Sequence, residues 1–419
     1  MNIVIVSQYY SPEPVPIPRA VAQGMAERGH HVRVVTAYPN YPGGTLFEGV
    51  RQRWRHSERD GDVMVRRVPV FVSHSRNPLA RILSYLSFAA SSLTSARFVR
   101  QADVVYVYAT PMTAAISPSV WSLVGGAPYV LHVQDLWPES VTGSSMVGGR
   151  TLQRLLGISL RPWLRNLYQR AAATIALGPT MSRMLQERGA PVDRIHTVLN
   201  WATEGSRDTQ AARVRSSAVP GLALMYAGNI GEMQDLDTVV RAVALVRDLP
   251  GLRVTLVGSG VAEKRLRQLV QDLDLSCIEF LGRVPFDQMS AHYQSSDFQL
   301  VTLKDLPIFR ATIPSKLQAS LAAGIPVITT IAGDVGEIVQ SEGLGFTTAP
   351  GDVERLAEVL RSAHALSQGE RNAMGERAHR HYDRTMSSAS GLDTIEKTLI
   401  EAARRPDASR RMARKKRTR

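Results

Sequence analysis

A short segment in the second half of the chain combines the start of a predicted helix with a lysine. Ser315 follows a proline and is of a type that often caps a helix N-terminus, and Lys316 lies in the first helical turn. Free N–H groups at a helix N-terminus bind anions, and a lysine there is electrostatically unfavourable unless an anion is present. A diphosphate would interact favourably with both groups. The alternative is a solvated surface lysine beside an ordinary cap.

Glycine-rich segments follow three strands that are predicted upstream of this helix. They are residues 227–231, residues 258–260 and the stretch Gly282-Arg283-Val284. Doubly wound sheets bind ligands at the carboxyl ends of their strands, and glycine lets a nucleotide approach the backbone closely. Together with Lys316, these loops predict a nucleotide diphosphate site that includes the backbone near Gly228, Arg283 and Val284.

Polar residues also follow a predicted buried strand in the first half of the chain. This strand ends at His132, and Gln134 and Asp135 follow. Asp135 is placed to take a proton from an acceptor hydroxyl, or it caps the next turn. A histidine inside a strand is more often a core residue, so His132 has both interpretations. Glu13 and Arg19 flank a proline-rich loop and either contact an acceptor or are solvated loop charges.

The predicted elements that carry these residues alternate between strand and helix. The chain opens with a strand at 2–7, a proline-stiffened loop at 9–18, a helix at 19–28 and a strand at 31–36. This order is typical of a Rossmann-like half, although the loop lacks the glycine fingerprint of dinucleotide-binding proteins. A second series starts at residue 222, after the polar, serine-rich stretch 204–220. Two such halves predict an α/β protein with a ligand cleft between them.

Composition narrows the class of protein. The chain has 419 residues, enough for two or three domains, and 44% of them are hydrophobic. The single cysteine, Cys277, excludes a disulfide framework and a cysteine metal cluster, and it is consistent with a reducing cytoplasm. The first residues lead directly into a strand, so we expect no signal peptide. No apolar run is long enough to span a membrane.

The net charge of +13 is unevenly distributed. Residues 63–102 and 140–186 contain arginines but no acidic residue, and the last 16 residues contain nine Arg or Lys and one Asp. This balance implies an anionic partner. Since no aromatic residues are interleaved with the basic tail, an anionic membrane surface is favoured over nucleic acid, for which we expect no specific binding.

One predicted helix, residues 150–173, adds to the membrane interpretation. Its apolar residues recur at helical spacing with arginines between them: Leu152, Leu155, Leu156, Leu160, Trp163, Leu164 and Leu167. This pattern is typical of a helix that lies in a membrane interface. A helix that packs within the protein and exposes a basic face would show the same pattern.

Several motifs resemble those of the retaining glycosyltransferases of the GT-B family 4. Residues 28–35 resemble that family's second strand, and residues 317–328 and 333–339 resemble two of its signatures. Three further motifs resemble the WbuB/WcaI-type subgroup, whose members assemble O-antigen, capsule or colanic acid: Tyr38-Pro-Asn-Tyr-Pro-Gly-Gly44, Gln134-Asp-Leu-Trp-Pro-Glu-Ser140 and Thr312-Ile-Pro-Ser-Lys-Leu-Gln318. The resemblance covers nearly the whole chain.

The chain departs from the family pattern at charged positions. Alanines 311 and 319 occupy the positions of the family's glutamate pair, and Asn229 and Gln234 occupy those of its Arg–Lys phosphate pair. The usual catalytic histidine falls near Gln134. A diphosphate still needs cationic donors. The available cations are Lys316, Arg283, Arg310 and Lys304, of which Lys316 is best placed.

The resemblance implies the domain organisation of a GT-B protein. The expected segments are an acceptor domain at 1–203, a linker at 204–220, a donor domain at 221–385, a helix at 386–404 that returns to the first domain, and a basic tail at 405–419. The family residue that matches Glu337 lies near the donor site, although in this chain Glu337 could instead cap its own helix. Asn40 and Tyr41, in a subgroup motif, are expected at the acceptor with Glu13 and Arg19.

The implied activity is transfer of a sugar, such as an L-FucNAc-like or other N-acetyl amino sugar. The donor would be a UDP-sugar and the acceptor a polyprenyl-diphosphate-linked saccharide at the inner face of the plasma membrane. The family needs neither a metal nor a cofactor. Two alternatives remain, a UDP-sugar 2-epimerase of the same fold and a catalytically impaired scaffold.

Overall fold

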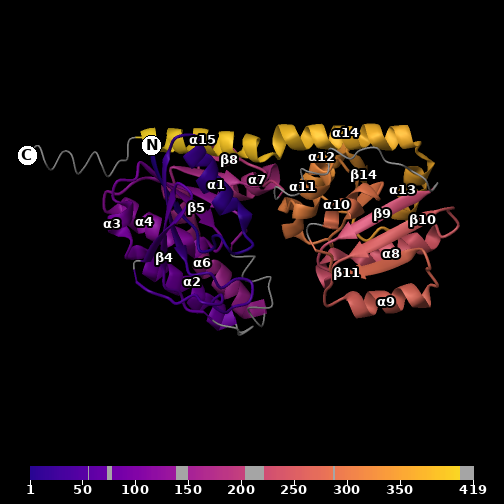
Figure 1. Cartoon of the computed structure of the whole chain (residues 1–419), viewed down its shortest axis with the longest axis horizontal. Helices are drawn as coiled ribbons and strands as arrows, with labels where there is room; N and C mark the ends of the chain where they lie inside the picture. Colours follow the sequence, from indigo (N-terminus) through magenta and orange to yellow (C-terminus); the bar gives the residue numbers. More distant parts are fainter. Residues whose placement is uncertain (55, 73–77, 138–149, 203–220, 286–287, 406–419) are drawn as a thin grey trace, which may run out of the picture. The chain divides into compact units, whose positions relative to one another are not determined.

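The computed structural model describes residues 1–54, 56–72, 78–137, 150–202, 221–285 and 288–405. The chain divides into two compact units. Unit 1 comprises residues 1–198 and 391–419, and unit 2 comprises residues 199–390. Each unit contains one sheet with helices packed against it (Figure 1).

Unit 1 contains an eight-stranded sheet in the order β3-β4-β2-β1-β5-β6-β7-β8. The strands are β1 (Asn2–Val6), β2 (His31–Ala37), β3 (His56–Asp60), β4 (Val63–Val68), β5 (Val104–Ala109), β6 (Tyr129–Val133), β7 (Ala173–Ala176) and β8 (Ile195–Thr197). All pairs are parallel except the β3–β4 hairpin, which turns at Gly61. The central strands are apolar and almost completely buried, as expected for a parallel sheet covered on both faces.

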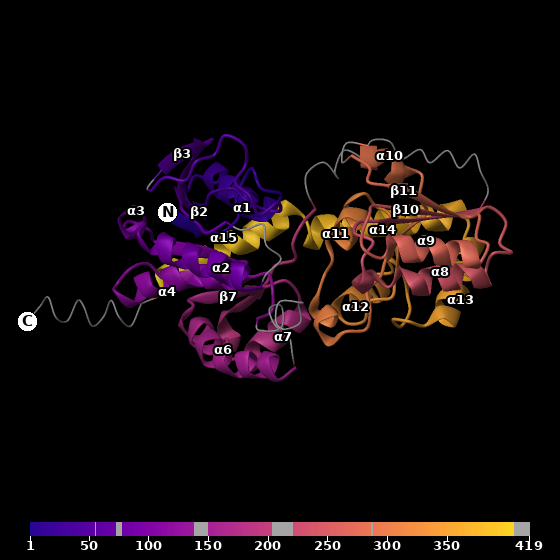
Figure 2. The same ribbon diagram turned by 90° about the horizontal axis from the view of Figure 1, so that it is seen from below.

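The helices of unit 1 are α1 (Pro16–Glu27), α2 (Pro78–Leu93), α3 (Ala96–Val99), α4 (Ile116–Leu123), α6 (Arg150–Arg170), α7 (Pro179–Glu187) and α15 (Ser388–Arg404). Helix α2 packs beside α4 (Figure 2). The hydroxyls of Ser92 and Ser117 are hydrogen-bonded between these helices. Helix α1 begins at Pro16, so the predicted loop at 9–18 is too long. Proline is tolerated in a first turn because the N–H it lacks would have no partner within the helix.

Helix α15 packs on unit 1 although it lies at the end of the described chain (Figure 1). Arg28 pairs with Asp393 at 2.6 Å, and His30 contacts Glu396 at 2.8 Å. Leu392 packs so closely on Gly24 of α1 that an added Cβ would lie 2.5 Å from its Cδ1 atom. A glycine on this face of α1 therefore lets the two helices approach.

Unit 2 contains a six-stranded parallel sheet in the order β11-β10-β9-β12-β13-β14. The strands are β9 (Leu222–Ala227), β10 (Leu252–Val257), β11 (Ile278–Gly282), β12 (Phe298–Val301), β13 (Val327–Thr329) and β14 (Gly345–Thr347). The helices are α8 (Leu236–Leu245), α9 (Glu263–Asp272), α10 (Met289–Gln294), α11 (Ser315–Ala322), α12 (Asp334–Ser341), α13 (Val353–Ala365) and α14 (Gln368–Thr385). Strand β14 is absent from the sequence prediction, because three residues are too short for a period-two pattern.

Two apolar clusters hold this sheet between its helices (Figure 1). Helices α8, α9 and α13 contribute to one cluster, and α11, α12 and α14 contribute to the other. A buried ion pair joins Arg371 of α14 to Asp297 at 3.0 Å, and the same guanidinium donates to the Gly221 and His364 carbonyls. The loops that follow β9, β10 and β11 are thus supported by a well-packed layer.

Candidate active site

Helix α11 begins where the sequence predicts, but its capping differs from the prediction. Pro314 occupies the N-cap position in an extended conformation, and Ser315 is the exposed first helical residue. The prediction that Ser315 is the N-cap is therefore wrong. Proline has no side-chain acceptor for the first helical N–H groups, so the end of α11 presents these groups uncapped by its N-cap side chain.

Lys316 turns back from α11 toward strand β9. Its ammonium nitrogen hydrogen-bonds the Tyr226 hydroxyl and lies 3.7 Å from the centre of the Tyr226 ring. The Tyr226 hydroxyl in turn donates to the Asn229 carbonyl at 2.5 Å. Desolvation lowers the pKa of Lys316 to about 7, and burial raises the pKa of Tyr226. Lys316 is therefore not the solvated surface lysine of the alternative interpretation.

Gly228 makes room for this lysine. Its backbone has φ +139°, and an added Cβ would lie 2.7 Å from the Cε atom of Lys316. A Cβ on Gly258 would collide with the Gly228 carbonyl oxygen, so the loops after β9 and β10 also require glycine where they touch. Backbone hydrogen bonds join them, from Gly228 N–H to Val257 at 2.9 Å and from Ile230 N–H to Ser259 at 3.0 Å.

Asn229 and Gln234, which replace the family's charged pair, contact each other. The Asn229 amide donates to the Gln234 side-chain oxygen at 3.3 Å, and that oxygen also accepts the Gly231 N–H at 3.1 Å. The pair therefore shapes the loop after β9. Its neutral amides bring no charge for a diphosphate.

The remaining predicted donor residues are more exposed. Arg283 is exposed and donates to the Ser259 hydroxyl at 2.7 Å, and Val284 beside it is half-buried. Glu337 lies exposed in the first turn of α12, whose N-cap residue is Gly333. Of the four predicted cations, Arg310 pairs with Asp305 at 3.4 Å, and Lys304 pairs with Glu232 at 3.9 Å. Those two carry nearby counter-charges, which leaves Lys316 and Arg283 as the better candidates.

The three predicted catalytic residues of unit 1 differ in accessibility. Asp135 is exposed and accepts a hydrogen bond from the Thr110 hydroxyl at 3.2 Å, while desolvation by the surrounding protein raises its pKa. Gln134 is half-buried beside it. His132 is fully buried, and its Nδ1 atom faces the Tyr106 hydroxyl. Burial lowers the pKa of His132 to about 3, so this ring is a neutral core residue and the catalytic prediction for it fails.

Glu13 has a structural role that the sequence did not reveal. Its buried carboxylate accepts backbone N–H groups from Tyr10 at 3.1 Å and from Asn40 and Tyr41 at 2.8 Å each. It therefore joins two loops and is not the solvated charge of one predicted alternative. The Asn40 side chain is also buried and donates to the Tyr38 carbonyl.

Arg19 and Tyr41 keep exposed surface. Arg19 forms a two-pronged ion pair with Asp60, at 2.8 and 2.9 Å, so it is a paired residue and not a free loop charge. Tyr41 is 44% exposed and its ring lies 5.1 Å from that of Tyr9. Of the predicted acceptor residues, these two can reach a ligand from solvent.

Helix α6 does not present the whole apolar face predicted for it. Leu164 and Leu167 are buried in the core of unit 1, and Trp163 packs against Trp137 with ring centres 6.4 Å apart. For this part of the helix, packing within the protein is correct and the interfacial prediction is wrong. The side chains of residues 150–156 lie outside the described part. In the described chain, no helix is both long and apolar enough to cross a bilayer.

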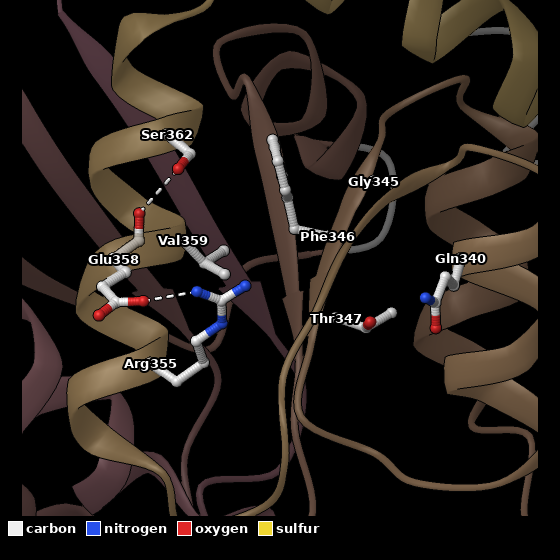
Figure 3. A pocket seen from close by; sticks show the side chains of 8 residues that line it. All are labelled: Gln340, Gly345, Phe346, Thr347, Arg355, Glu358, Val359 and Ser362. Carbon is white, nitrogen blue, oxygen red and sulfur yellow. Dashed lines mark hydrogen bonds and ion pairs between the residues drawn. The ribbon is translucent and has the colours of Figure 1, made fainter.

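A separate pocket of about 280 Å³ lies at the free edge of β14, between α12 and α13 (Figure 3). Arg355 and Glu358 line it and pair with each other at 2.5 Å, so their charges are already compensated. The pocket includes none of the predicted donor residues, and we assign no role to it.

The fold is that of the GT-B glycosyltransferases. HepE of Anabaena, solved with UDP and glucose, matches 96% of this chain and 99% of its own with a TM-score of 0.63 at 15% identity. WaaG, a glycosyltransferase involved in lipopolysaccharide biosynthesis, matches 95% of this chain and 99% of its own with a TM-score of 0.63 at 18% identity. At these identities the likeness concerns the fold alone, and it confirms the predicted class.

Sequence comparison identifies the family. Residues 16–201 match the glycosyl transferase 4-like domain, and residues 221–365 match the glycosyl transferases group 1. The chain therefore belongs to these glycosyltransferases, as its motifs predict. WcaI of Escherichia coli K12, a putative colanic acid biosynthesis glycosyl transferase, is 28% identical over 87% of this chain and 93% of its own length. AmsK of Erwinia amylovora, an amylovoran biosynthesis glycosyltransferase, is 25% identical over 48% of this chain, which spans half of that relative.

Proposed function

We propose that this chain transfers a sugar from a UDP-sugar to a polyprenyl-diphosphate-linked saccharide during synthesis of a bacterial surface polysaccharide. The observation that carries the proposal is the desolvated Lys316 beside the glycine-rich loops of unit 2. Relatives named for colanic acid and amylovoran synthesis, and a fold neighbour solved with UDP-glucose, support the choice of reaction and donor. An N-acetyl amino sugar of the L-FucNAc type is the sugar we favour.

Lys316 would act on the leaving group. When the bond between the sugar anomeric carbon and the diphosphate breaks, negative charge grows on the departing phosphate oxygen. An ammonium group held in a poorly solvated place stabilises such charge more strongly than one in water. The uncapped N–H groups of α11, from Ser315 onward, and Arg283 would contribute further donors.

The acceptor hydroxyl must lose a proton as its oxygen bonds to the sugar. We assign this step to Asp135, whose raised pKa makes the carboxylate a better base than an ordinary aspartate. The Thr110 hydrogen bond fixes its orientation. From the resemblance of its motifs to family 4, we also infer that the transfer retains the anomeric configuration and uses neither a metal nor a cofactor.

Helix α2 supplies a surface for a membrane-bound acceptor. Leu83 and Leu86 are each 49% exposed on α2, and Phe71 before the helix is 42% exposed. Arg81 and Arg97 are also exposed, and residues 63–102 contain no acid to oppose an anionic bilayer. We therefore place the protein on the inner face of the plasma membrane as a peripheral enzyme. Cosedimentation with phosphatidylglycerol vesicles should fall severalfold in Leu83→Ser/Leu86→Ser but not in Val124→Ser, which removes an apolar group 80% exposed on unit 1.

The decisive experiment combines Lys316→Ala with a lipid-linked acceptor assay. We expect wild type to release UDP and add one sugar mass to the lipid product, and the variant to lose at least 100-fold in rate while remaining folded. Full transfer by the variant would refute the role of Lys316. Free epimerised sugar without lipid product would identify an epimerase.

Alanine at both positions of the family's glutamate pair favours one other candidate, a scaffold that has lost catalysis. This candidate predicts neither UDP binding nor donor hydrolysis by wild type. Measuring UDP binding and donor hydrolysis by the wild-type protein therefore separates the scaffold from the transferase.

A further inference from the structure

A pocket of about 410 Å³ lies in unit 1 next to the loops that Glu13 joins. It forms where β2 and β4 end and β3 begins, because His56 and Arg67 are partners across the hairpin. The polar and aromatic residues that line the pocket are Tyr38, Arg51, Arg53, His56, Glu58 and Arg67. The carboxyl ends of parallel strands are where doubly wound sheets bind ligands.

The pocket has an excess of positive charge. Arg67 is buried and donates to Glu58 at 2.7 Å and to the Ala37 and Ser11 carbonyls. The Glu58 carboxylate therefore balances the charge of Arg67. Arg51 and Arg53 are exposed at the rim, and neither has an ion-pair partner among the described residues. Three arginines thus line the pocket against one carboxylate.

The segment that carries the rim arginines is held in place. The Tyr38 hydroxyl accepts the Arg53 N–H at 3.0 Å and donates to the Arg53 carbonyl at 3.1 Å. Gln52 exchanges two hydrogen bonds with the backbone of Val70, at 2.6 and 2.9 Å. Because the backbone is already fixed, binding would cost less ordering entropy than it would on a free loop.

The pocket also offers one flat surface. The exposed His56 ring is stacked on the buried Tyr38 ring, with centres 6.4 Å apart and planes at 25°. Aromatic faces with a few convergent polar groups are typical of small-ligand sites. Guanidinium groups bind carboxylate and phosphate oxygens in a two-pronged manner that lysine cannot reproduce.

We propose that this pocket binds an anionic group of the acceptor, a sugar carboxylate or a phosphate, through Arg51 and Arg53. The inference rests on the proposed function, since it assumes that unit 1 receives a saccharide acceptor. It extends that function by defining the acceptor as anionic. Arg67 is the floor of the pocket and positions Glu58 rather than meeting the ligand.

The test uses the full chain and the double variant Arg51→Ala/Arg53→Ala. Both side chains are exposed, so the variant should melt within a few degrees of wild type. The probes are glucuronic acid, glucose and inorganic diphosphate, and NMR titration measures the affinity of each. Saturating UDP is present throughout, so that the donor site is filled. The matched control is Arg59→Ala, an exposed arginine on β3 that does not line the pocket.

We expect wild type and Arg59→Ala to bind glucuronic acid or inorganic diphosphate at least tenfold more tightly than glucose. The double variant should lose that preference while its UDP affinity stays within twofold of wild type. A preference for glucuronic acid assigns the group to an acidic sugar, and a preference for inorganic diphosphate assigns it to the lipid diphosphate. Equal binding of glucose, or unchanged anion binding in the double variant, would overturn the proposal. If the wild-type protein does not bind UDP, the proposed donor site is refuted, whatever the result at this pocket.

Discussion

The pKa of Lys316 predicts how donor binding depends on pH. In the ligand-free site desolvation holds this pKa at about 7, against an ordinary value of 10.5. A bound diphosphate would raise it again, because an opposite charge favours the ammonium form. Binding therefore takes up a proton above pH 7, and the affinity should fall as pH rises through the free-state pKa. Between pH 6 and pH 8.5 the charged fraction of the free lysine drops about 30-fold, which corresponds to about 2 kcal/mol of binding free energy.

Isothermal titration with UDP-glucose measures this dependence, because its diphosphate ester does not titrate in that range. Repeating each titration in two buffers of different ionisation enthalpy counts the protons taken up, and we expect close to one at pH 8. Lys316→Arg keeps its charge throughout, so its affinity should be nearly constant over the same range. A flat wild-type profile, or the same slope in Lys316→Arg, would show that this lysine does not titrate on binding.

Three other predictions concern Lys316, the glycine beside it, and Glu13. Lys316→Met should stabilise the ligand-free protein by on the order of 1–3 kcal/mol at pH 6–7, because the native site carries an unfavourable charge there. This gain in the free energy of unfolding should vanish as the pH approaches 10.5, and chemical denaturation at both pH values measures it. Gly228→Ala should weaken UDP binding at least tenfold by displacing Lys316, whereas Gly351→Ala, which also has positive φ but no atom within 4 Å of the added Cβ, should leave the affinity unchanged. Glu13→Gln should cost about 1–3 kcal/mol of stability, because an amide cannot accept all three N–H groups, and UDP affinity should be unaffected; a large loss of UDP affinity would contradict a purely local role.

The fold was predictable because its signals are local and repeated. Buried strands such as β1 and β5 are continuous apolar runs, and several helices, such as α7, α11 and α12, are bounded by glycine or proline. The errors occur where a local signal is ambiguous. Pro16 and Pro18 indicate a loop as readily as a first helical turn, and Gly345-Phe-Thr347 is too short to show alternation.

The site was predictable only in part, because residue type does not reveal burial. His132 and Asp135 are three positions apart, yet one is sealed in the core and the other is exposed. The sequence places Glu13 in a proline-rich loop, where a charged residue is usually solvated. Only the three backbone N–H groups that donate to its carboxylate show its role. The rim arginines of the unit 1 pocket had no motif, since their juxtaposition depends on the β3–β4 hairpin and on Tyr38.

The loss of the family's charged pair and the retention of Lys316 have a common explanation in these contacts. A poorly solvated ammonium is costly in the ligand-free protein, and the glycine that makes room for it has an unfavourable backbone conformation for any other residue. Costs of this kind persist in proteins mainly where function requires them. A site that had merely decayed would be free to replace Lys316 by an apolar residue and gain stability. If the chain binds a diphosphate as we propose, the neutral pair Asn229–Gln234 beside a poorly solvated lysine therefore favours relocation of the phosphate-binding charge over its loss.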